Sequence, residues 1–558
     1  MPEYIKFKKS NCKNCYKCIR HCPVKSIRFS NHQANIVEDE CILCGHCFMV
    51  CPQNAKEIRN DIEKVKALIN SGQPIYASIA PSFVANYVGA SIKSMEKALK
   101  KLGFSGVSET ALGATLVKKR YEELIYAGNQ SIIISSCCPS VNLLIQKYYP
   151  EALAYLADVL SPMEAHCEWI KAAHPNAKTV FIGPCIAKKS EAEQYLGTVD
   201  CVLTFEELSE WLEDEKITFE PIPDTSANSR TRLFPTAGGI LRTMDCDSAD
   251  YELVSVDGIE NCIRAIKDII NGNLKKCFIE MSACEGSCIG GPAMAKNHRT
   301  PVRNYLTVNR YAGKKDFNIA MLSAEKMKKD IYYIGLNSDT PNDSAIEDVL
   351  KKMGKTKPEH ELNCGSCGYD SCREKAAAVL LGKADLTMCL PFLKEKAESF
   401  SDNIINNTPN GVIVLNESLE IQQLNSMAQQ ILNIKNAGDV LGEHAVRVID
   451  PSIFLEVLES GENQYDKHLY LAEYEKYVVQ TVLYDKSYHI LIGIMRDITD
   501  AEKERAKKDM INQRAIEITD KVVEKQMRVV QEIASLLGET TAETKIALTK
   551  LKESLGDE

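Results

Sequence analysis

The stretch "SIIISSCCPS", residues 131–140, decides how the middle of this chain folds. Three consecutive isoleucines indicate a buried β-strand, which leads directly into two adjacent cysteines and a proline. Because neighbouring side chains of an extended strand point to opposite faces, Cys137 and Cys138 are expected to do different jobs.

Around this stretch, between residues 61 and 345, apolar runs alternate with helical stretches. The runs typical of strands, besides the one above, are "PIYASIAP" (74–81), "KTVFIGPC" (178–185) and "KCFIEMSAC" (276–284). The stretches typical of helices include "SIKSMEKALKKL" (91–102) and "EELSEWLEDE" (206–215). This alternation predicts an α/β fold with a largely parallel sheet.

Several cysteines follow these strands directly. Cys138, Cys185 and Cys284 each come at the end of an apolar run, and Cys288 lies four residues further on. Loops at the carboxyl ends of parallel strands meet at one edge of a sheet and bind ligands there. The four thiols are therefore expected to converge, and four thiolates are what one iron–sulfur cubane requires.

The composition limits the class of protein. The chain has 558 residues, 22 cysteines, 45% hydrophobic residues and a net charge of -9. Its length predicts several domains, and its charge argues against nucleic acid as the main partner. The start, "MPEYIKFKKS", lacks an apolar signal region, and no long apolar run predicts a membrane span. We expect a cytoplasmic protein whose cysteines bind metal rather than form disulfides.

The first sixty residues contain one cysteine spacing twice, in "CKNCYKCIRHCP" (12–23) and "CILCGHCFMVCP" (41–52). This is the run of bacterial two-cluster ferredoxins, in which three close cysteines bind one cubane and the fourth binds the other. It predicts a ferredoxin-like domain over residues 1–60. One 4Fe-4S cluster would be held by Cys12, Cys15, Cys18 and Cys51, and the other by Cys41, Cys44, Cys47 and Cys22. Two zinc sites are the alternative, although zinc ligands normally come in pairs.

Three stretches of the middle region resemble the signatures of the iron–iron hydrogenases. They are "SSCCPSV" (135–141), "GPCIAKKSE" (183–191) and "EMSACEGSCIGGP" (280–292), with further matches in "IAPS" (79–82), "SPMEA" (161–165) and "TAGGILRT" (236–243). The resemblance implies a two-lobed α/β hydrogenase catalytic domain over residues 61–345. The catalytic cluster of that family joins a cubane, through one cysteine, to a two-iron centre with CO, cyanide and azadithiolate ligands.

The resemblance also implies roles for the matched cysteines. Cys138, Cys185, Cys284 and Cys288 would ligate the cubane, with Cys288 bridging to the two-iron centre. Cys137 would be a spare thiol that passes protons to and from that centre. An ordinary thiol pKa of about 8.5 suits this role near neutral pH. The alternative for Cys137 is a small buried apolar residue.

Four further residues would surround the two-iron centre. Lys188 would donate a charge-assisted hydrogen bond to one cyanide, and Glu191 would orient Lys188. Pro81 and Ser82 would lie beside the other cyanide. The resemblance thus places Cys137, Lys188 and Glu191 in the catalytic machinery.

The chain departs from the family pattern at several positions. Val141 stands where the family has tryptophan, and Gly183 and Ser282 stand where it has methionine. Ser287 replaces a glycine, and Pro292 and Ala293 interrupt a glycine triplet. The loss of both methionines is expected to open space around the two-iron centre.

The proton route also departs from the family. The stretch "VSETALGATLVKKRY" (107–121) has Arg120 and Tyr121 where the family has relay carboxylates. A guanidinium cannot shuttle protons at neutral pH, so turnover is slow or another route exists. Glu252 and Glu285 are the candidate substitutes, although each has the pattern of an ordinary surface residue.

A third cysteine pattern, "NCGSCGYDSCREKAAAVLLGKADLTMC" (363–389), predicts a small four-cysteine 4Fe-4S domain over residues 346–396. Its ligands would be Cys364, Cys367, Cys372 and Cys389, with a zinc knuckle as the alternative. Five other cysteines have no ligand spacing and are expected to be buried apolar residues: Cys167, Cys201, Cys246, Cys262 and Cys277.

The sequence from residue 397 onward has no cysteine. Residues 397–503 resemble an α+β PAS domain, for which no ligand is assigned. Its histidines, His444, His468 and His489, are haem-ligand candidates, but lone histidines are more often exposed. Residues 504–558 are charged and helical, and Val523, Met527 and Val530 keep heptad spacing before Gly538. They predict a helical hairpin or coiled coil that pairs with a second copy or with a signalling partner.

These features favour a hydrogen-sensing hydrogenase that interconverts H2 with protons and electrons. It would need maturation enzymes, an anaerobic cytoplasm and a ferredoxin-like electron partner, and its helices would report to a signalling protein as a homodimer. A metabolic hydrogenase is one alternative, and a site that binds a ligand without turnover is another. A further alternative is a non-catalytic iron–sulfur protein like the eukaryotic assembly factors, which lack the spare thiol.

Overall fold

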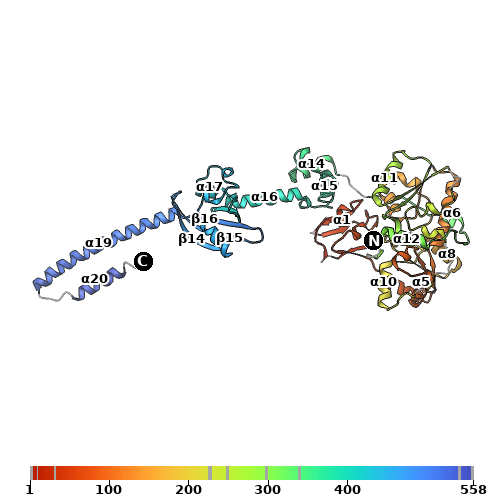
Figure 1. Ribbon diagram of the computed structural model, residues 1–558, viewed down its shortest axis with the longest axis horizontal. Helices are drawn as coiled ribbons and strands as arrows, with labels where there is room; N and C mark the ends of the chain where they lie inside the picture. The colour runs from red at the N-terminus through yellow and green to blue at the C-terminus, as the bar shows by residue number, and fades with distance from the viewer. Residues whose placement is uncertain are drawn as a thin grey trace. The chain divides into compact units, whose positions relative to one another are not determined.

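The computed structural model describes residues 4–8, 11–30, 33–220, 222–223, 229–246, 250–295, 300–336, 341–537 and 542–554 (Figure 1). The chain divides into two compact units, Met1–Phe392 and Leu393–Glu558. Among the described helices, none combines the length and the apolar character needed to cross a membrane.

The amino-terminal part of the first unit is built from two similar halves. Strand β1 (Ile5–Phe7) pairs antiparallel with β4 (Lys56–Ile58), and β2 (Ile27–Ser30) pairs with β3 (Gln33–Ile36). Each half has a one-turn helix inside its cysteine run, α1 (Lys17–Arg20) and α2 (His46–Met49). Both helices start from a left-handed residue, so the repeated sequence forms a repeated backbone.

Two parallel sheets form the middle of the first unit. One has the strand order β6-β5-β8-β9 and the other β10-β11-β7. Their strands are β5 (Ile75–Ile79), β6 (Gly106–Glu109), β7 (Ile132–Ile134), β8 (Lys178–Gly183), β9 (Cys201–Thr204), β10 (Glu252–Asp257) and β11 (Cys277–Ser282). The predicted α/β fold with parallel strands is confirmed, and each of the four quoted runs contains a strand.

Helices pack around these sheets. Those of the middle region are α3 (Ile62–Asn70), α4 (Phe83–Asn86), α5 (Ile92–Lys101), α6 (Ala111–Ala127), α7 (Pro139–Tyr148), α8 (Pro162–Ala173), α9 (Ala187–Gln194), α10 (Phe205–Asp214), α11 (Ile259–Ile270), α12 (Pro301–Tyr311) and α13 (Ala324–Met327). Helix α8 begins with a capping box, in which Ser161 and Glu164 bond each other's backbone amides. Helices α5 and α10 confirm the two helices expected from the sequence.

The four-cysteine region contains α14 (Asp343–Lys352) and α15 (Cys372–Leu380) and packs on the amino-terminal part. The Lys25 ammonium donates to the Gly368 carbonyl at 2.9 Å. The Phe29 amide donates to the Lys383 carbonyl at 2.7 Å. A Cβ at Gly368 would lie 2.9 Å from the Ile19 side chain, so the two backbones approach closely.

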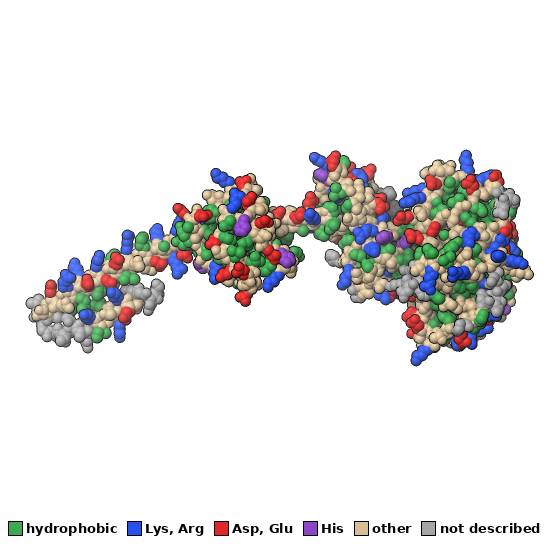
Figure 2. Space-filling model, in the orientation of Figure 1, with side chains coloured by type: hydrophobic (Ala, Val, Ile, Leu, Met, Phe, Trp, Pro, Cys, Tyr) green, Lys and Arg blue, Asp and Glu red, His purple; other side chains and the backbone are tan. Residues whose placement is uncertain are grey.

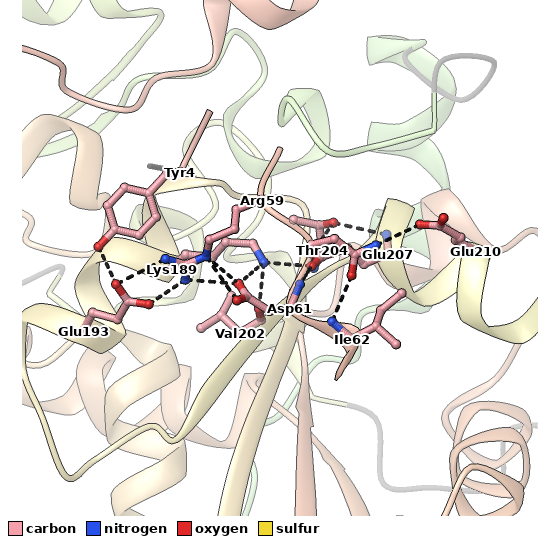
Figure 3. A network of polar contacts seen from close by, with 11 residues as sticks. Tyr4, Arg59, Asp61, Ile62, Lys189, Glu193, Val202, Thr204, Glu207 and Glu210 are labelled. Atoms are coloured by element: carbon pink, nitrogen blue, oxygen red, sulfur yellow. Dashed lines mark hydrogen bonds and ion pairs between the residues drawn. The ribbon is translucent and has the colours of Figure 1, made fainter. Parts of the chain in front are cut away.

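Buried charges join the amino-terminal part to the middle region (Figure 3). The Lys189 ammonium of α9 is 1% exposed and donates to Asp61 at 2.6 Å and to Glu207 at 2.9 Å. Four residues further along α9, Glu193 accepts from the Tyr4 hydroxyl at 2.7 Å and from Arg59 at 2.5 Å. Because each charged group has a partner of opposite charge, the desolvation cost of burying it is offset.

The second unit contains a five-stranded antiparallel sheet of order β13-β12-β16-β15-β14. Its strands are β12 (Gly411–Asn416), β13 (Ile421–Leu424), β14 (Gln464–Leu471), β15 (Lys476–Asp485) and β16 (Ile490–Asp497), and its short helices are α17 (Ser426–Ile431) and α18 (Ser452–Ser460). Helix α16 (Leu390–Asn407) precedes the sheet. This is the α+β arrangement that the sequence predicts.

Two helices end the described chain, α19 (Thr499–Leu537) and α20 (Ala542–Ser554). They form a hairpin in which Lys552 pairs with Asp520 at 3.1 Å (Figure 1). Charged side chains of both signs cover α19 (Figure 2). Val523, Met527 and Val530 are partly buried in this hairpin. The predicted break at Gly538 lies outside the described residues.

We expect Gly45→Ala to destabilise the protein more than Gly72→Ala. Both glycines have a left-handed backbone, φ +75° and +78°, which costs a side chain about 1–2 kcal/mol. A Cβ at Gly45 would also lie 2.5 Å from the Pro292 Cβ, whereas nothing lies within 4 Å at Gly72. Overpacking adds about 1–3 kcal/mol at the first site alone. Thermal unfolding of both variants measures the difference, and equal midpoints would contradict this packing.

Candidate active site

The carboxyl ends of four strands, β5, β7, β8 and β11, meet around one cavity of about 110 Å³. Its wall contains the thiols of Cys44, Cys137, Cys138, Cys185, Cys284 and Cys288, together with Pro81, Ser82 and Lys188. The structure therefore brings together the four predicted cubane ligands, which come from three distant segments. It also places Pro81, Ser82 and Lys188 beside them, as the resemblance implies.

The local sequence explains how the first two thiols are presented. Pro139 occupies the first turn of α7, where its missing amide is not needed. Cys138 is the extended N-cap of that helix, with φ -97° and ψ 106°. Its sulfur accepts a hydrogen bond from the Ala283 amide at 3.5 Å, which ties it to the segment after β11.

The donor set of the cavity fits an anionic cluster with small acceptor ligands. Cys138, Cys185, Cys284 and Cys288 lie near enough for the charge of one to raise the pKa of another. Among the described residues, the buried Ser82 hydroxyl has no hydrogen-bond partner. It is a donor left over for a ligand in the cavity, since a buried hydroxyl without a partner is costly.

Lys188 is held by Glu191, as expected. Its ammonium donates to Glu191 Oε2 at 2.5 Å and to the Cys137 carbonyl at 3.3 Å. Glu191 also accepts from the Ser161 hydroxyl at 3.1 Å and from the Lys329 ammonium at 2.6 Å. Burial disfavours the charged form of Lys188, but the nearby carboxylates keep its pKa above the ordinary value. Lys188 is therefore a permanent cation at the cavity wall.

Cys137 points to a different neighbour from Cys138, as their alternation predicts. Its sulfur lies 3.2 Å from the Tyr121 hydroxyl, and Tyr121 is fully buried. Burial raises the pKa of Cys137 to about 12, with the Tyr121 hydrogen bond acting in the opposite direction, so the thiol does not have the ordinary pKa that the sequence analysis expects. The Ser136 hydroxyl, 3.1 Å from the same Tyr121 oxygen, donates to the Val159 carbonyl. This chain of hydroxyls ends on backbone rather than on a carboxylate.

The other proton-route candidates do not reach the cavity. Glu252 on β10 and Glu285 after β11 are both exposed, and neither is part of the cavity wall. Arg120 pairs with Glu123 at 2.7 Å on α6. The surface interpretation of both glutamates agrees with their positions.

One expectation about space in the cavity is wrong. The absence of methionine at position 183 does not leave a void, because the Phe181 ring fills the place. A Cβ at Gly183 would lie 2.6 Å from Phe181 Cζ, and Phe181 is part of the cavity wall. Ser282 does line the cavity, as a hydroxyl in place of a thioether, and Val141 is fully buried.

Glu280 is a site residue that the sequence analysis missed. It lies in β11, is 2% exposed, lines the cavity and accepts from the Ile240 and Leu241 amides at 3.0 and 3.1 Å. Burial raises its pKa to about 7. The signal was a single acid within the buried run "KCFIEMSAC". A buried carboxyl with such a pKa can exchange protons at neutral pH.

Seven of the amino-terminal thiols lie in two groups, each made of residues from one expected ligand set. Cys22, Cys41, Cys44 and Cys47 line one small cavity. Burial raises the pKa of Cys18, and the nearby Cys12 and Cys15 add to this shift. Backbone amides also donate to sulfur in this part of the chain, from Ser26 to Cys22 and from Ala55 to Cys51, each at 3.3 Å. Cys44 also lines the cavity that contains Cys284, so one thiol of the second group borders that site.

The four-cysteine region forms a further cavity lined by Cys364, Cys367, Cys372 and Cys389. Lys375 on α15 lines it as well, is 1% exposed and donates to the Asp385 carbonyl. Burial lowers the pKa of Lys375 to about 8. An ammonium facing four thiols fits an anionic iron–sulfur cluster.

The residues set aside by the sequence analysis do not line the cavities described above. The five cysteines without ligand spacing are buried, as expected. His444, His468 and His489 of the second unit are all exposed. Their positions give no support for haem ligation.

Comparisons with known proteins agree with this geometry. Residues 73–292 match the family described as iron only hydrogenase large subunit, C-terminal domain. This central part of the chain is thus similar to the iron-only hydrogenase family over residues 73–292. Residues 4–66 match a 4Fe-4S dicluster domain, 361–391 an Fe-S cluster family and 399–469 the PAS fold. These matches support iron–sulfur clusters rather than zinc.

The relatives of the hydrogenase domain are distant. Iron hydrogenase 1 of Clostridium pasteurianum is 24% identical over 51% of this chain and 63% of its own length. Cytosolic Fe-S cluster assembly factor NAR1 of Yarrowia lipolytica is 22% identical over 36% of this chain and 48% of its own length. The chain thus spans less than two thirds of either relative. FeFe-hydrogenase HydA1 from Chlamydomonas reinhardtii matches in structure with 14% identity and a TM-score of 0.41, over 50% of this chain and all of that one.

We expect Glu280→Gln to remove a pH dependence of stability. Burial raises the pKa of Glu280 from 4.5 to about 7, so the folded state binds this proton more tightly than the unfolded state. Its contribution to stability is full below about pH 4.5 and is lost as the pH rises through 7, a loss of about 3 kcal/mol. Glutamine keeps the acceptor oxygen without the charge.

Urea unfolding of the cubane-loaded protein between pH 5 and pH 8 measures this difference. Glu252→Gln on the neighbouring strand is the matched control, because Glu252 is exposed. Wild-type and Glu280→Gln curves that stay parallel across this range would show that the carboxyl is already ionised at pH 5.

Proposed function

We propose that this chain is an iron–iron hydrogenase that converts H2 to two protons and two electrons, reversibly, and reports the result through its second unit. We propose the same domain limits as the sequence analysis: residues 1–60, 61–345, 346–396, 397–503 and 504–558. One observation carries the proposal: the Cys137 thiol and the Lys188 ammonium face the same cavity as four mutually close cysteines. A site that only stored a cubane would need the four cysteines alone.

The residues that line the cavity would bind the catalytic cluster. Cys138, Cys185, Cys284 and Cys288 would bind the cubane, with Cys288 shared with a two-iron centre that carries CO, cyanide and azadithiolate. When bound, that centre supplies the open iron position at which H2 is cleaved. Lys188 would bind one cyanide through the N–H that its two protein acceptors leave over. Ser82, with Pro81, would bind the other, because the Ser82 hydroxyl has no partner among the described residues.

Protons would leave through Cys137, the thiol nearest the cavity that is not a cubane ligand. Tyr121 can pass a proton only to Ser136 within this hydrogen-bonded chain. The route therefore lacks the carboxylate that makes proton transfer fast, and we propose a low turnover. Glu280 is a second proton-exchanging group on the cavity wall.

Electrons would leave one at a time through the iron–sulfur clusters. Cys44 lines both the cavity that contains Cys284 and the second amino-terminal site. The first amino-terminal site reaches the surface at the exposed Cys15. Residues 4–37 include many lysines and arginines but no aspartate or glutamate. We propose that an acidic, ferredoxin-like carrier docks there.

The sensory part of the proposal rests on the PAS fold and the helical hairpin. In α19, Val522, Val529 and Ile533 are 53%, 42% and 48% exposed. An apolar stripe on a charged helix suits pairing with a second copy and a signalling protein. The chain would act in an anaerobic cytoplasm with maturation enzymes that supply the two-iron centre.

The similarity to NAR1 favours a second candidate function, a non-catalytic iron–sulfur protein that keeps only the cubane ligands. The proposed hydrogenase requires Cys137 and Lys188, whereas the second candidate gives neither residue a task. Their presence in the cavity wall favours the enzyme.

We expect the anaerobically matured protein to show CO and cyanide infrared bands that shift under H2. Cys137→Ala should keep the bands but lower the rate of H2 oxidation about 100-fold, because proton transfer loses its first group. Cys167→Ala removes a fully buried thiol outside the cavity and serves as the control. Cubanes intact but no bands after maturation would establish the non-catalytic candidate instead.

We expect Lys13→Glu with Lys17→Glu to raise the KM for an acidic ferredoxin about tenfold without changing kcat, because these lysines flank Cys15. Added salt should raise the KM of the wild type in the same way. Lys275→Glu, at an exposed lysine before β11, is the control. A KM that responds to neither change would place the docking surface elsewhere.

A further inference from the structure

We propose that Lys329 is a positioning residue that holds the Lys188 ammonium at the cavity wall by occupying the carboxylates that would otherwise draw it away. This inference rests on the proposed function, in which Lys188 binds a cyanide. Lys329 is remote in sequence from every signature motif.

Four charged side chains form a closed group behind the cavity. The Lys329 ammonium is 1% exposed and donates to Glu164 Oε2 at 2.7 Å and to Glu191 Oε1 at 2.6 Å. Lys188 pairs with the other oxygen of Glu191 at 2.5 Å. Two cations thus balance two anions, and Glu191 is divided between the two lysines.

The division leaves Lys188 with a donor to spare. An ammonium has three N–H groups, and within the described residues Lys188 uses them on Glu191 and the Cys137 carbonyl. Lys188 lines the cavity, so the remaining N–H is available to an acceptor there. A cyanide nitrogen is such an acceptor.

Without Lys329 this balance fails. Glu164 and Glu191 would face one cation, and Glu164 Oε1 is already buried without a partner among the described residues. A buried carboxylate without a counter-charge is costly, so the two anions compete for the same ammonium. Lys188 would then turn from the cavity toward Glu164.

Lys329 lies in a segment without helix, residues 328–336, which follows α13 and precedes the four-cysteine region. The Leu160 amide donates to the Met327 carbonyl, and the Lys329 amide donates to the Asp158 carbonyl, each at 2.9 Å. These bonds fix the segment beside the start of α8, the helix that contains Glu164. The Lys329 ammonium also lies 4.2 Å from the centre of the Tyr195 ring. The position of the ammonium is therefore determined from several sides.

The chain provides a matched control in Lys189. It is also 1% exposed and also donates to two buried carboxylates, Asp61 and Glu207. That group joins the dicluster domain to α9 and includes neither Lys188 nor Glu191. Loss of a buried ion pair in general is thus separable from loss of this particular one.

The test uses the matured full chain with Lys329→Met, Lys189→Met and the double variant Lys329→Met/Glu164→Gln. We expect Lys329→Met to shift one of the two cyanide bands and to leave the other in place. Lys189→Met should leave both bands unchanged. The double variant should restore the wild-type band, because Glu164→Gln removes the competing charge. A Lys329→Met spectrum identical to wild type, or a shift that the double variant keeps, would overturn the inference.

A second measurement does not need the two-iron centre. In a crystal structure of the cubane-loaded Lys329→Met chain, we expect Lys188 to leave the Cys137 carbonyl and bond Glu164. Lys188 unmoved in that structure would overturn the inference. A wild-type chain without cyanide bands would overturn the proposed function instead, so the two failures are distinguishable.

Discussion

Helix α9 is the element on which the rest of the catalytic domain depends, because its charged side chains are buried in two opposite directions. Residues three or four apart share a face of a helix, so Lys188 and Glu191 point to one side, and Lys189 and Glu193 to another. The first pair faces the cavity. The second anchors the dicluster domain through Asp61, Arg59 and Tyr4 (Figure 3). One helix thereby fixes the position of the cavity relative to the dicluster domain.

Burying charges costs desolvation free energy, so the buried ion pairs here act mainly by specifying one arrangement of side chains. A buried ion pair rarely stabilises more than an apolar contact of the same size would. It does, however, tolerate only one arrangement, because a misplaced partner leaves a charge unpaired. The groups around Lys188 and Lys189 therefore set the geometry of donors and clusters more strictly than packing alone. A hydrogen bond to a small ligand needs this strictness, since its strength falls steeply with misalignment.

The proton side of the cavity is built in the opposite way. Tyr121 and Ser136 contribute neutral hydroxyls, and the Ser136 hydroxyl donates to the Val159 carbonyl. Such a chain fixes Cys137 in place but does not deliver a proton to water. The low turnover in the proposed function rests on this arrangement. Glu280 remains the cavity residue whose ionisation changes near neutral pH.

The sequence alone determined the cluster-binding pattern, the α/β class of the catalytic domain and the PAS fold. Cluster ligation requires particular side chains at short fixed spacings, so the cysteines of "CKNCYKCIRHCP" identify their function locally. The short isoleucine run before Cys137 likewise predicts its strand, because burial of β7 depends on its own residues.

Only the tertiary structure decided which distant residues complete the site. Glu164, Glu280 and Lys329 carry no local signature, since their meaning depends on what the fold places opposite them. Phe181 fills the space that the change at position 183 was expected to open, because the volume of a cavity is set by neighbours on other strands. Local spacing determines which cofactor can bind, and long-range packing determines the charges and shape that surround it.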